Sequence, residues 1–455
     1  MPQPNLPPTL AVGALYDAFL QTALRQFFGR ATFETEPMLS ASSDGRLAIE
    51  PSEDPCVLHV RWFGTRYVLR VPERRPFTKH ETRLARAIGS VLAARYHAIV
   101  NPKAMVERGE LFRGSIEDRY AGAFVDGQPY PLGAGEARAD RIASAIEVLR
   151  VAALSSYENR AISTGVLVLG TDHDPLAPER AIGPRAPLYS QTLTGVKSFF
   201  RLVDGQRTLF LVSRTGRLLD IVDVQRWSEA MFGSAALTAP CPSAYQAHAK
   251  ATLTGGHAAL VLSPSHEIKV FAEGAQILTF RHARWQLLDL QAKYDLWAEA
   301  VGRNDLAMRL FQTALELSDA RQGALFVMLR EPATAVPQLL VGADRMDVDA
   351  EGDAVAGGPT RRDLLGLVTG RSITDLEPSV LAALASLDGA TVTDTKGQLI
   401  GAGAILRHPP LEPAMPVIEG ARTTAAIAAS RFGPVLKVSE DGAISFYDGQ
   451  RVWDV

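Results

Sequence analysis

The stretch EGARTTAAIAAS, residues 419–430, has the residue types of a helix start that holds phosphate. Gly420 permits a tight turn before the helix. The amides of Arg422, Thr423 and Thr424 are then expected to point out of the first turn, whose partial positive charge binds anions. The two hydroxyls and the guanidinium would add hydrogen bonds to a phosphate. A Thr-capped helix with an Ala-rich packing face is the alternative explanation.

A second stretch, LDGATVTDTKGQLIGAGAIL at 387–406, puts a carboxylate next to a predicted strand. Thr391–Asp394 and Gln398–Leu406 are expected to form a β-hairpin. Asp388 comes just before the first strand, and Gly389 allows a close approach of the backbone. A carboxylate in this position can hold Mg²⁺ or Mn²⁺, because hard cations prefer oxygen ligands. An Asp-Gly turn without any ligand is the alternative.

Together these stretches resemble the diadenylate cyclase (DAC) domain, a family that joins two ATP molecules into cyclic di-AMP. The resemblance covers 305–455. In that family Asp-Gly-Ala carries the metal-binding aspartate and Gly-Thr-Arg-His-Arg grips the phosphates, which correspond to 388–390 and 420–424 here. The family's Ser-Glu before the last hairpin and its adenine-facing backbone also have counterparts. The resemblance thus implies a metal at Asp388 and a nucleotide against Gly389, Ala390, Leu406, Gly420, Arg422, Thr423, Thr424, Ser439 and Glu440.

The second motif departs from the family pattern in three places. Gly420 and Arg422 remain, but the family's Thr, His and Arg are replaced by Ala421, Thr423 and Thr424. Forming the phosphodiester expels pyrophosphate, so the transition state needs cationic donors on the leaving group. Losing one such donor typically costs about two to three decades in rate. We therefore expect a pocket with one positive charge that holds a nucleotide without cyclising it.

The resemblance implies a non-cyclising sensor of a nucleotide or cyclic di-nucleotide in bacterial signalling or defence. Such a sensor would pass occupancy to a protein effector, and Mg²⁺ or Mn²⁺ would accompany a bound nucleoside triphosphate. In the active family two DAC domains meet face to face, which implies a homodimer or a pairing within one chain. An active cyclase with altered chemistry is the first alternative. A structural scaffold with a vestigial pocket is the second.

The elements that position these motifs occur twice in the chain, once in 137–285 and once in 305–455, with a helical connector at 286–304. In each copy an amphipathic helix leads to an apolar strand, then to a strand behind an Asp-Gly, a small-residue helix and a hairpin. Any two α/β units share part of this order, which is the alternative to duplication. The corresponding residues are Asp204 and Asp388, Gln246 and Arg422, and Ser263 and Ser439.

The first copy has lost most of the second motif. Gln246, Ala247 and His248 stand at its position, without the glycine or the arginine. Gln206 also replaces the alanine of the first motif. We expect this copy to be a degenerate DAC-like domain that serves as a packing partner. The predicted fold class is α/β (α+β), with tandem domains built on mixed central sheets flanked by helices.

Residues 1–128 predict a small α+β module. Leu15, Phe19, Ala23 and Phe27 have helical spacing, and VLHVRWFGTRYVLRV predicts a hairpin around Gly64. TKHETRLARAIGSVLAARY predicts a helix that opens with a capping box between Thr78 and Glu81. This last helix resembles the closing helix of GAF-type sensor domains.

The composition favours a cytoplasmic protein. A net charge of −3 gives no attraction to nucleic acid or to an anionic membrane. The two cysteines are far apart, and no apolar run reaches the length of a bilayer. The first residues, MPQPNLPPTL, do not have the pattern of a signal peptide. Two acidic stretches, DRMDVDAEGD at 344–353 and TDHD at 171–174, are expected to be a solvated loop and an exposed turn.

Overall fold

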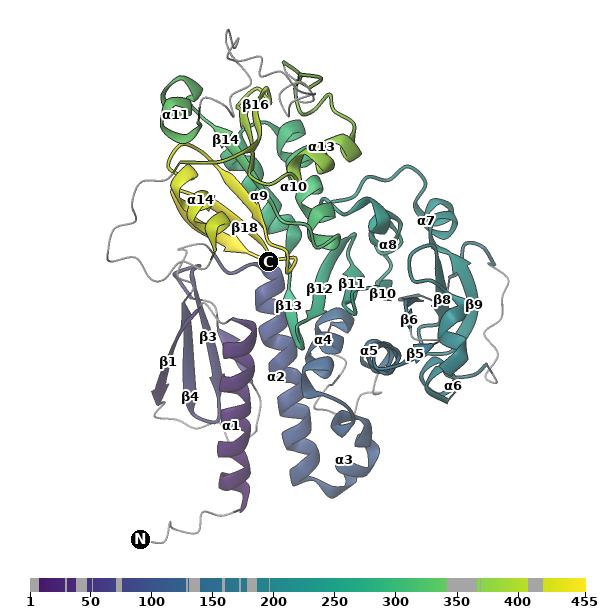
Figure 1. Ribbon diagram of the computed structural model, residues 1–455. Helices are drawn as coiled ribbons and strands as arrows, with labels where there is room; N and C mark the ends of the chain where they lie inside the picture. The colour runs from purple at the N-terminus through teal and green to yellow at the C-terminus, as the bar shows by residue number, and fades with distance from the viewer. Residues whose placement is uncertain are drawn as a thin grey trace. The chain divides into compact units, whose positions relative to one another are not determined.

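The computed structural model describes residues 8–28, 31–37, 47–50, 52–70, 76–127, 130, 140–157, 160–171, 173–177, 186–195, 197–341, 366–368, 370–407 and 420–455. Contacts divide the chain into two compact units (Figure 1): unit 1 is Met1–Thr238 with Ala244–Asp289, and unit 2 is Ala239–Ser243 with Leu290–Val455. None of the helices in these ranges has the length and apolar character that a membrane crossing requires. The acidic stretch at 344–353 lies outside the described residues.

Unit 1 begins with a four-stranded antiparallel sheet. Its strands are β1 (Thr32–Pro37), β2 (Ala48–Glu50), β3 (Val57–Trp62) and β4 (Thr65–Arg70), in the order β1-β4-β3-β2. The hairpin predicted around Gly64 is confirmed, because β3 pairs with β4 and Gly64 adopts a φ of 81°. Trp62 and Tyr67 are buried, and Tyr16 of helix α1 (Pro8–Phe27) meets the Trp62 ring edge-on.

Helix α2 (Lys79–Val100) starts at the predicted capping box. The Thr78 hydroxyl accepts from the amide of Glu81, and the Glu81 carboxylate accepts from the amide of Thr78. This reciprocal pair satisfies two amides that would otherwise lack a helical partner. The helices that follow are α3 (Pro102–Glu107), η1 (Gly109–Phe112), α4 (Ile116–Asp126) and α5 (Arg141–Ala153).

Charged side chains bond the start of α2 to the later part of unit 1. His80 Nδ1 lies 2.9 Å from Asp289 Oδ1, and its Nε2 lies 3.2 Å from Glu273 Oε2. Arg83 forms an ion pair with the same Glu273. These two carboxylates raise the pKa of His80 to about 9. The module predicted at 1–128 therefore belongs to the same compact unit as the sheet that follows it.

That second sheet of unit 1 has seven strands. They are β7 (Thr164–Val168), β8 (Thr208–Val212), β9 (Leu218–Asp223), β10 (Ala258–Leu262), β11 (Ile268–Ala272), β12 (Ala275–Arg281) and β13 (Arg284–Leu287). Their order is β13-β12-β11-β10-β7-β8-β9, and only β7 and β8 run parallel. Between them lie α6 (Tyr189–Gly195), η2 (Lys197–Leu202), α7 (Val224–Phe232), η3 (Ser243–Tyr245) and α8 (Gln246–Lys250), and a short ribbon, β5 (Ser156–Tyr157) with β6 (Arg160–Ala161), precedes the sheet.

Unit 2 contains a six-stranded mixed sheet. Its strands are β14 (Ala324–Leu329), β15 (Ala390–Asp394), β16 (Leu399–Ala404), β17 (Val435–Val438), β18 (Ile444–Asp448) and β19 (Gln450–Asp454). Their order is β16-β15-β14-β17-β18-β19, and only β14 and β15 run parallel. The described helices of this unit are α9 (Leu290–Val301), α10 (Asn304–Asp319), α11 (Pro332–Leu339), α13 (Pro378–Ala385) and α14 (Ala421–Ala429).

The two mixed sheets share one topology. When β7 is matched to β14, the order β9-β8-β7-β10-β11-β12 corresponds to β16-β15-β14-β17-β18-β19. Corresponding neighbours also run in the same sense: β7 with β8 and β14 with β15 are parallel, and the other pairs are antiparallel. The hairpin turns also agree: Ser263 donates its amide to Glu267, and Ser439 donates its amide to Ala443, both at 2.8 Å. The mixed sheets flanked by helices confirm the predicted α/β (α+β) fold class.

A hydrophobic core fixes one face of the second mixed sheet. Alternate residues of β14 point to this face, and α11 and α14 supply the helical side of the cluster. Figure 1 shows α14 beside the C-terminal strands, and it packs on β14 and β17. The buried side chains include Leu325, Val327, Leu329, Val336, Ala390, Ala404, Leu406, Ala426, Ala429 and Val435.

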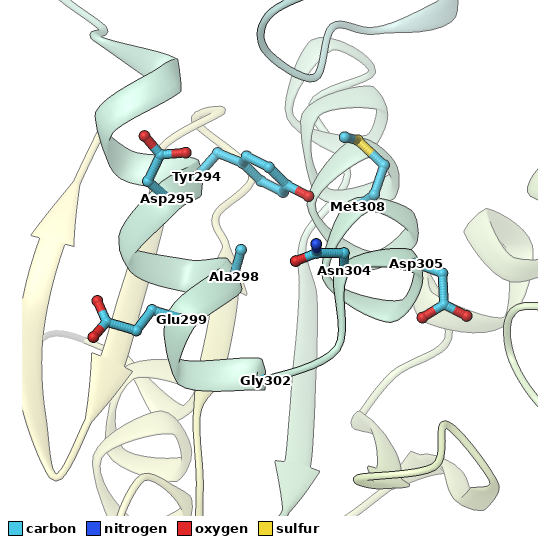
Figure 2. A pocket seen from close by; sticks show the side chains of 8 residues that line it. All are labelled: Tyr294, Asp295, Ala298, Glu299, Gly302, Asn304, Asp305 and Met308. Carbon is cyan, nitrogen blue, oxygen red and sulfur yellow. The ribbon is translucent and has the colours of Figure 1, made fainter.

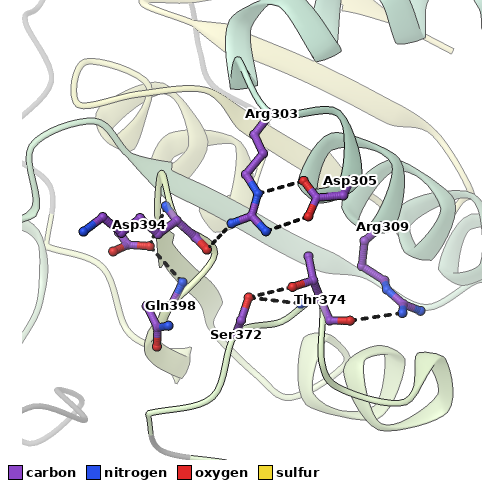
Figure 3. Close-up of polar contacts among 8 residues, drawn as sticks. Arg303, Asp305, Arg309, Ser372, Thr374, Asp394 and Gln398 are labelled. Carbon is purple, nitrogen blue, oxygen red and sulfur yellow. Dashed lines mark hydrogen bonds and ion pairs between the residues drawn. The ribbon is translucent and has the colours of Figure 1, made fainter.

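The turn between β15 and β16 is held at its far end by Arg303 (Figure 3). The Arg303 guanidinium makes two bonds to the carboxylate of Asp305, at 2.7 and 2.6 Å, and donates to the carbonyl of Lys396 in the turn. Asp394 accepts from the amides of Lys396 and Gln398 at 2.8 Å. These bonds fix the end of β15 that lies opposite Asp388.

Candidate functional site

The first motif lies where β15 begins. The parallel pairing begins with Phe326 of β14 opposite Thr391 of β15, so Gly323 and Asp388, each three residues earlier, precede the two strands at the same end of the sheet. Asp388 is exposed. Gly389 has a φ of 115°, and a Cβ at this position would collide with the backbone of Gly403 on the neighbouring strand. Glycine is therefore required here by packing, whether or not a ligand is present.

The guanidinium of Arg422 lies at the same edge of the sheet. Arg422 is in the first turn of α14, and its Nη1 donates to Glu440 Oε1 at 2.8 Å. A Cβ on Gly323 would collide with this guanidinium, so Gly323 makes the room that Arg422 occupies. Since Gly323 and Asp388 both precede these parallel strands, both predicted motifs lie at the N-terminal end of β14 and β15.

The amides of Thr423 and Thr424 do not point out of the helix as the sequence led us to expect. Both donate to the carbonyl of Gly420, at 3.1 and 3.3 Å, and the Thr424 hydroxyl lies 3.4 Å from the same oxygen. Gly420 is the N-cap of α14, and the carbonyl of an N-cap residue accepts the first bond of the helix. The chemistry offered by this turn is thus carried by side chains, chiefly the Thr423 hydroxyl and the Arg422 guanidinium.

A second cation, Lys437 on β17, stands beside this turn. Its Nζ donates to the Thr423 hydroxyl at 3.1 Å. Lys437 pairs with Leu325 across the ladder, so its side chain is on the face that α14 covers. Burial lowers the pKa of Lys437; Arg422 and Arg451 also lower it, while Asp441 and Asp454 raise it. The expectation of a single positive charge was therefore wrong.

Lys437 does not stand out in the sequence as a site residue, because it is the only polar residue of the strand VLKV. A weak signal existed: Lys437 lies two positions after Val435 and therefore shares its face of the strand. A lysine on the helix-covered face of a strand is unusual unless its ammonium finds a partner. That partner, the hydroxyl of Thr423, comes from a helix that the strand pattern alone does not place.

Ser439 and Glu440 form the turn between β17 and β18. The amide of Gly442 donates to the Ser439 carbonyl at 2.9 Å, which closes the turn. Glu440 projects from it, with 72% of its side chain exposed, and its carboxylate reaches Arg422. The structure thus links Gly420, Arg422, Thr423, Thr424 and Glu440 through direct bonds, with Ser439 in the same turn as Glu440, and places Asp388 and Gly389 at the same end of the sheet.

Ala390 and Leu406 contribute to the core instead of the surface. Their side chains are 1% and 8% exposed and belong to the hydrophobic cluster of unit 2. Leu406 also forms an isolated bridge with Leu340, and Arg407 donates its amide to Leu339 at 2.8 Å. A ligand at these positions would have only their backbone to contact.

The described residues contain no group of three or more His, Cys, Asp or Glu side chains that could hold a metal ion. The exposed carboxylate of Asp388 offers oxygen ligands from one residue only. Mg²⁺ is commonly bound by one or two carboxylates together with substrate phosphates. The residues therefore fit a metal that arrives with a phosphate ligand, and they do not form a cage that would hold the metal alone.

In the first copy, 137–285, the positions of the two motifs also contact each other. Their polar side chains, however, make hydrogen bonds to the backbone of the same copy. Asp204 Oδ1 accepts from the amides of Gln206, Arg207 and Thr208 at 2.8 to 2.9 Å. Burial would raise the pKa of Asp204, but these bonds outweigh it and the pKa lies below its usual value. His248 is fully buried and its Nε2 donates to the Gly205 carbonyl at 3.0 Å. The polar groups of this copy thus hold its own turn together.

Burial lowers the pKa of His248 to about 4, so the imidazole is neutral at ordinary pH. A neutral ring adds no positive charge for a phosphate. In the stretch TDHD, predicted as an exposed turn, Thr171 and His173 are exposed but Asp174 is not. Asp174 is 6% exposed and accepts from the indole of Trp227 at 3.3 Å, because α7 packs over the end of the strand.

A separate open hollow of about 730 Å³ lies between α9 and α10 (Figure 2). Figure 2 shows the carboxylates of Asp295 and Glu299 on the outer side of α9, whereas the Tyr294 ring points toward α10. No residue of the two predicted motifs lines it. Its lining consists of Tyr294, Asp295, Ala298, Glu299, Gly302, Asn304, Asp305 and Met308.

Comparison with known proteins adds little to this geometry. No protein-family model and no curated protein matches the chain. A solved structure described as a hypothetical membrane spanning protein from Bacillus cereus is 20% identical, with a TM-score of 0.26, over 36% of this chain and 70% of that one. A double mutant of DacA from Staphylococcus aureus is 21% identical, with a TM-score of 0.20, over 32% and 83%. At such TM-scores the resemblance to the DAC domain remains a prediction from the sequence.

Proposed function

We propose that unit 2 binds a nucleotide through its phosphates at the edge formed by β14, β15 and the start of α14. The observation that carries this proposal is the convergence of two cations on one helical turn. Lys437 Nζ lies 3.1 Å from the Thr423 hydroxyl, and the neighbouring Arg422 lies in the space left by Gly323. Both cations are suited to phosphate oxygens, Arg422 through its planar fork and Lys437 as a point charge.

The surroundings of Lys437 support an anionic ligand. Its ammonium is half-buried, and within the described parts of the chain no carboxylate lies within ion-pairing distance of it. Burial lowers the pKa of Lys437, and Asp441 and Asp454 raise it only from beyond ion-pairing distance, so a negative charge in direct contact with the ammonium is missing. A phosphate oxygen would supply the missing charge and accept from both Lys437 and the Thr423 hydroxyl.

The same residues support binding without ring closure. Ala421, Thr423 and Thr424 replace the family's Thr, His and Arg, and Lys437 restores one of the two lost positive charges. One missing donor alone typically reduces the rate by about two to three decades. Asp388 would hold Mg²⁺ or Mn²⁺ only together with the ligand's phosphates. We therefore favour a sensor of a nucleotide or cyclic di-nucleotide that transmits occupancy to a protein effector.

An active diadenylate cyclase is the second function to be tested, because Lys437 returns a cation to the site. The experiment is a thermal-shift panel of ATP, ADP and cyclic di-AMP with Mn²⁺, with product analysis of the same samples. A sensor gains about 2.7 kcal/mol of stability at a hundred times the dissociation constant and forms no product. A cyclase forms cyclic di-AMP from ATP and loses this activity in Asp388→Asn. A scaffold with a vestigial pocket shows neither response.

A further inference from the structure

We propose that Glu440 is an internal competitor for the phosphate site: in the empty protein its carboxylate occupies the position on Arg422 that a ligand phosphate takes. This inference rests on the proposed function and adds a form of regulation to the same site. Glu440 Oε1 lies 2.8 Å from Arg422 Nη1, which is the distance of a charge-assisted bond. Each N–H of a guanidinium serves one acceptor, so a phosphate oxygen that takes the N–H now bonded to Glu440 must displace that carboxylate.

The two partners differ in freedom to move. Arg422 is 36% exposed, and its guanidinium lies against Gly323 at the start of β14. Glu440 is 72% exposed and projects from a turn whose backbone is closed by bonds between Ser439 and Ala443 and between Ser439 and Gly442. The side chain of Glu440 can therefore swing into water while the turn and the guanidinium stay in place.

The ion pair between Glu440 and Arg422 must be weak enough for a ligand phosphate to displace the carboxylate. Exposed ion pairs contribute little to stability because water and salt screen them. The apparent dissociation constant is the intrinsic constant divided by the fraction of molecules in which the binding position is open. An ion pair of ordinary surface strength would therefore weaken the binding of every phosphate ligand by about two- to fivefold.

This model has a signature that separates it from simple repulsion. When Glu440 leaves Arg422 completely, the cost is the same for each ligand, so one common factor applies to all of them. Repulsion from a carboxylate that stays in place would instead weaken the more highly charged ligand more strongly. If Glu440 itself bound the ligand, replacing Glu440 would weaken binding instead of tightening it. Competition also implies that occupancy releases the carboxylate of Glu440 into solvent.

The experiment measures dissociation constants of ADP and of cyclic di-AMP by calorimetry on the full chain, with Mg²⁺ held constant. The variants are the original protein, Glu440→Gln and the control Glu299→Gln, which removes the same charge from the exposed surface of α9 in the same unit. We expect Glu440→Gln to tighten both ligands by one common factor of about two to five, and Glu299→Gln to change neither.

Three outcomes would overturn the inference while leaving the proposed function intact. These are unchanged binding in Glu440→Gln, weaker binding in Glu440→Gln, and a gain that grows with the charge of the ligand. Failure of both ligands to bind the original protein and Glu440→Gln alike would instead remove the proposed function, and the inference would fall with it.

Discussion

The ammonium of Lys437 donates a hydrogen bond to the hydroxyl of Thr423 at 3.1 Å, which joins a central strand of unit 2 to the first turn of α14. The two residues are 14 positions apart in the sequence and belong to different elements. Their contact places a second positive charge next to Arg422. The proposed phosphate site depends on this pair of cations.

Lys437→Met should weaken nucleotide binding without unfolding unit 2. Methionine keeps the apolar stem that packs beside Leu325 but removes the charge. Bonds to charged groups contribute about 1.5–3 kcal/mol, so the dissociation constant should rise about tenfold or more. Calorimetric titration with ADP measures this change. Lys396→Met, at an exposed turn of the same unit, is the matched control and should bind as the original protein does.

The pH dependence of binding should follow Lys437. Because burial lowers its pKa, the ammonium loses its proton at a lower pH than an exposed lysine, and phosphate binding should fall as pH rises through that value. The charged groups that act on it are Arg422, Arg451, Asp441 and Asp454. The free energy of unfolding should change with pH in the opposite direction to binding. Because the pKa of Lys437 is lower in the folded protein, the unfolded chain binds more protons, and the contribution of Lys437 to stability rises with pH. Titrations of binding against pH should lose this step in Lys437→Met; an unchanged step would assign it to another group.

Gly323→Ala should impair binding with little effect on folding. The three atoms nearest to its Cβ would all belong to the guanidinium of Arg422, the flexible end of a side chain, which the Cβ would push from its place. Alanine in a compatible backbone also stabilises by about 0.4–1 kcal/mol through the unfolded state. Parallel calorimetry and thermal unfolding measure the two effects. Equal binding in Gly323→Ala would show that the observed position of Arg422 is not the one that the ligand uses.

Gly389→Ala should instead lower the stability of unit 2. Its Cβ would collide with the backbone of Gly403, and its φ of 115° is unfavourable for alanine. We expect a loss of about 1–3 kcal/mol in the free energy of unfolding, measured by denaturant titration. A fully stable Gly389→Ala would contradict the observed packing of β15 against β16, and Gly401→Ala at the paired edge strand provides a comparison.

How far the sequence predicts this site can be judged residue by residue. The alternation in VLHVRWFGTRYVLRV and the capping box at Thr78 are local signals, and both elements form as predicted. The turn at Ser439 matches the turn at Ser263, because both follow from short-range chemistry that each copy carries in its own sequence.

The errors concern groups whose partners are set by three-dimensional packing. Whether the amides of Thr423 and Thr424 face a ligand depends on the residue at which α14 begins, and with Gly420 as the N-cap both amides bond to its carbonyl. Lys437 becomes part of the site only because α14 crosses its face of the sheet. The contact of His80 with Asp289, which is 209 positions away, is likewise a product of packing that the sequence does not indicate.

His80 should make the stability of unit 1 depend on pH. Asp289 and Glu273 raise its pKa from 6.5 to about 9, so its stabilising contribution is complete below about pH 6.5 and is lost as pH rises through about 9. Allowing for solvent screening, we expect a loss of about 1–2 kcal/mol across this range. Thermal unfolding at several pH values measures it. His80→Gln should remove this dependence, and its persistence in that variant would point to another titrating group.

The most direct test of the central claim is a calorimetric titration of ATP with Mn²⁺ into the full chain, followed by analysis of the nucleotides in the same cell. The original protein should bind ATP and return it unchanged, and the double variant Arg422→Gln with Lys437→Met should not bind. Equal affinity in the double variant would contradict the placement of the phosphates on these two cations, and the appearance of cyclic di-AMP would contradict binding without turnover.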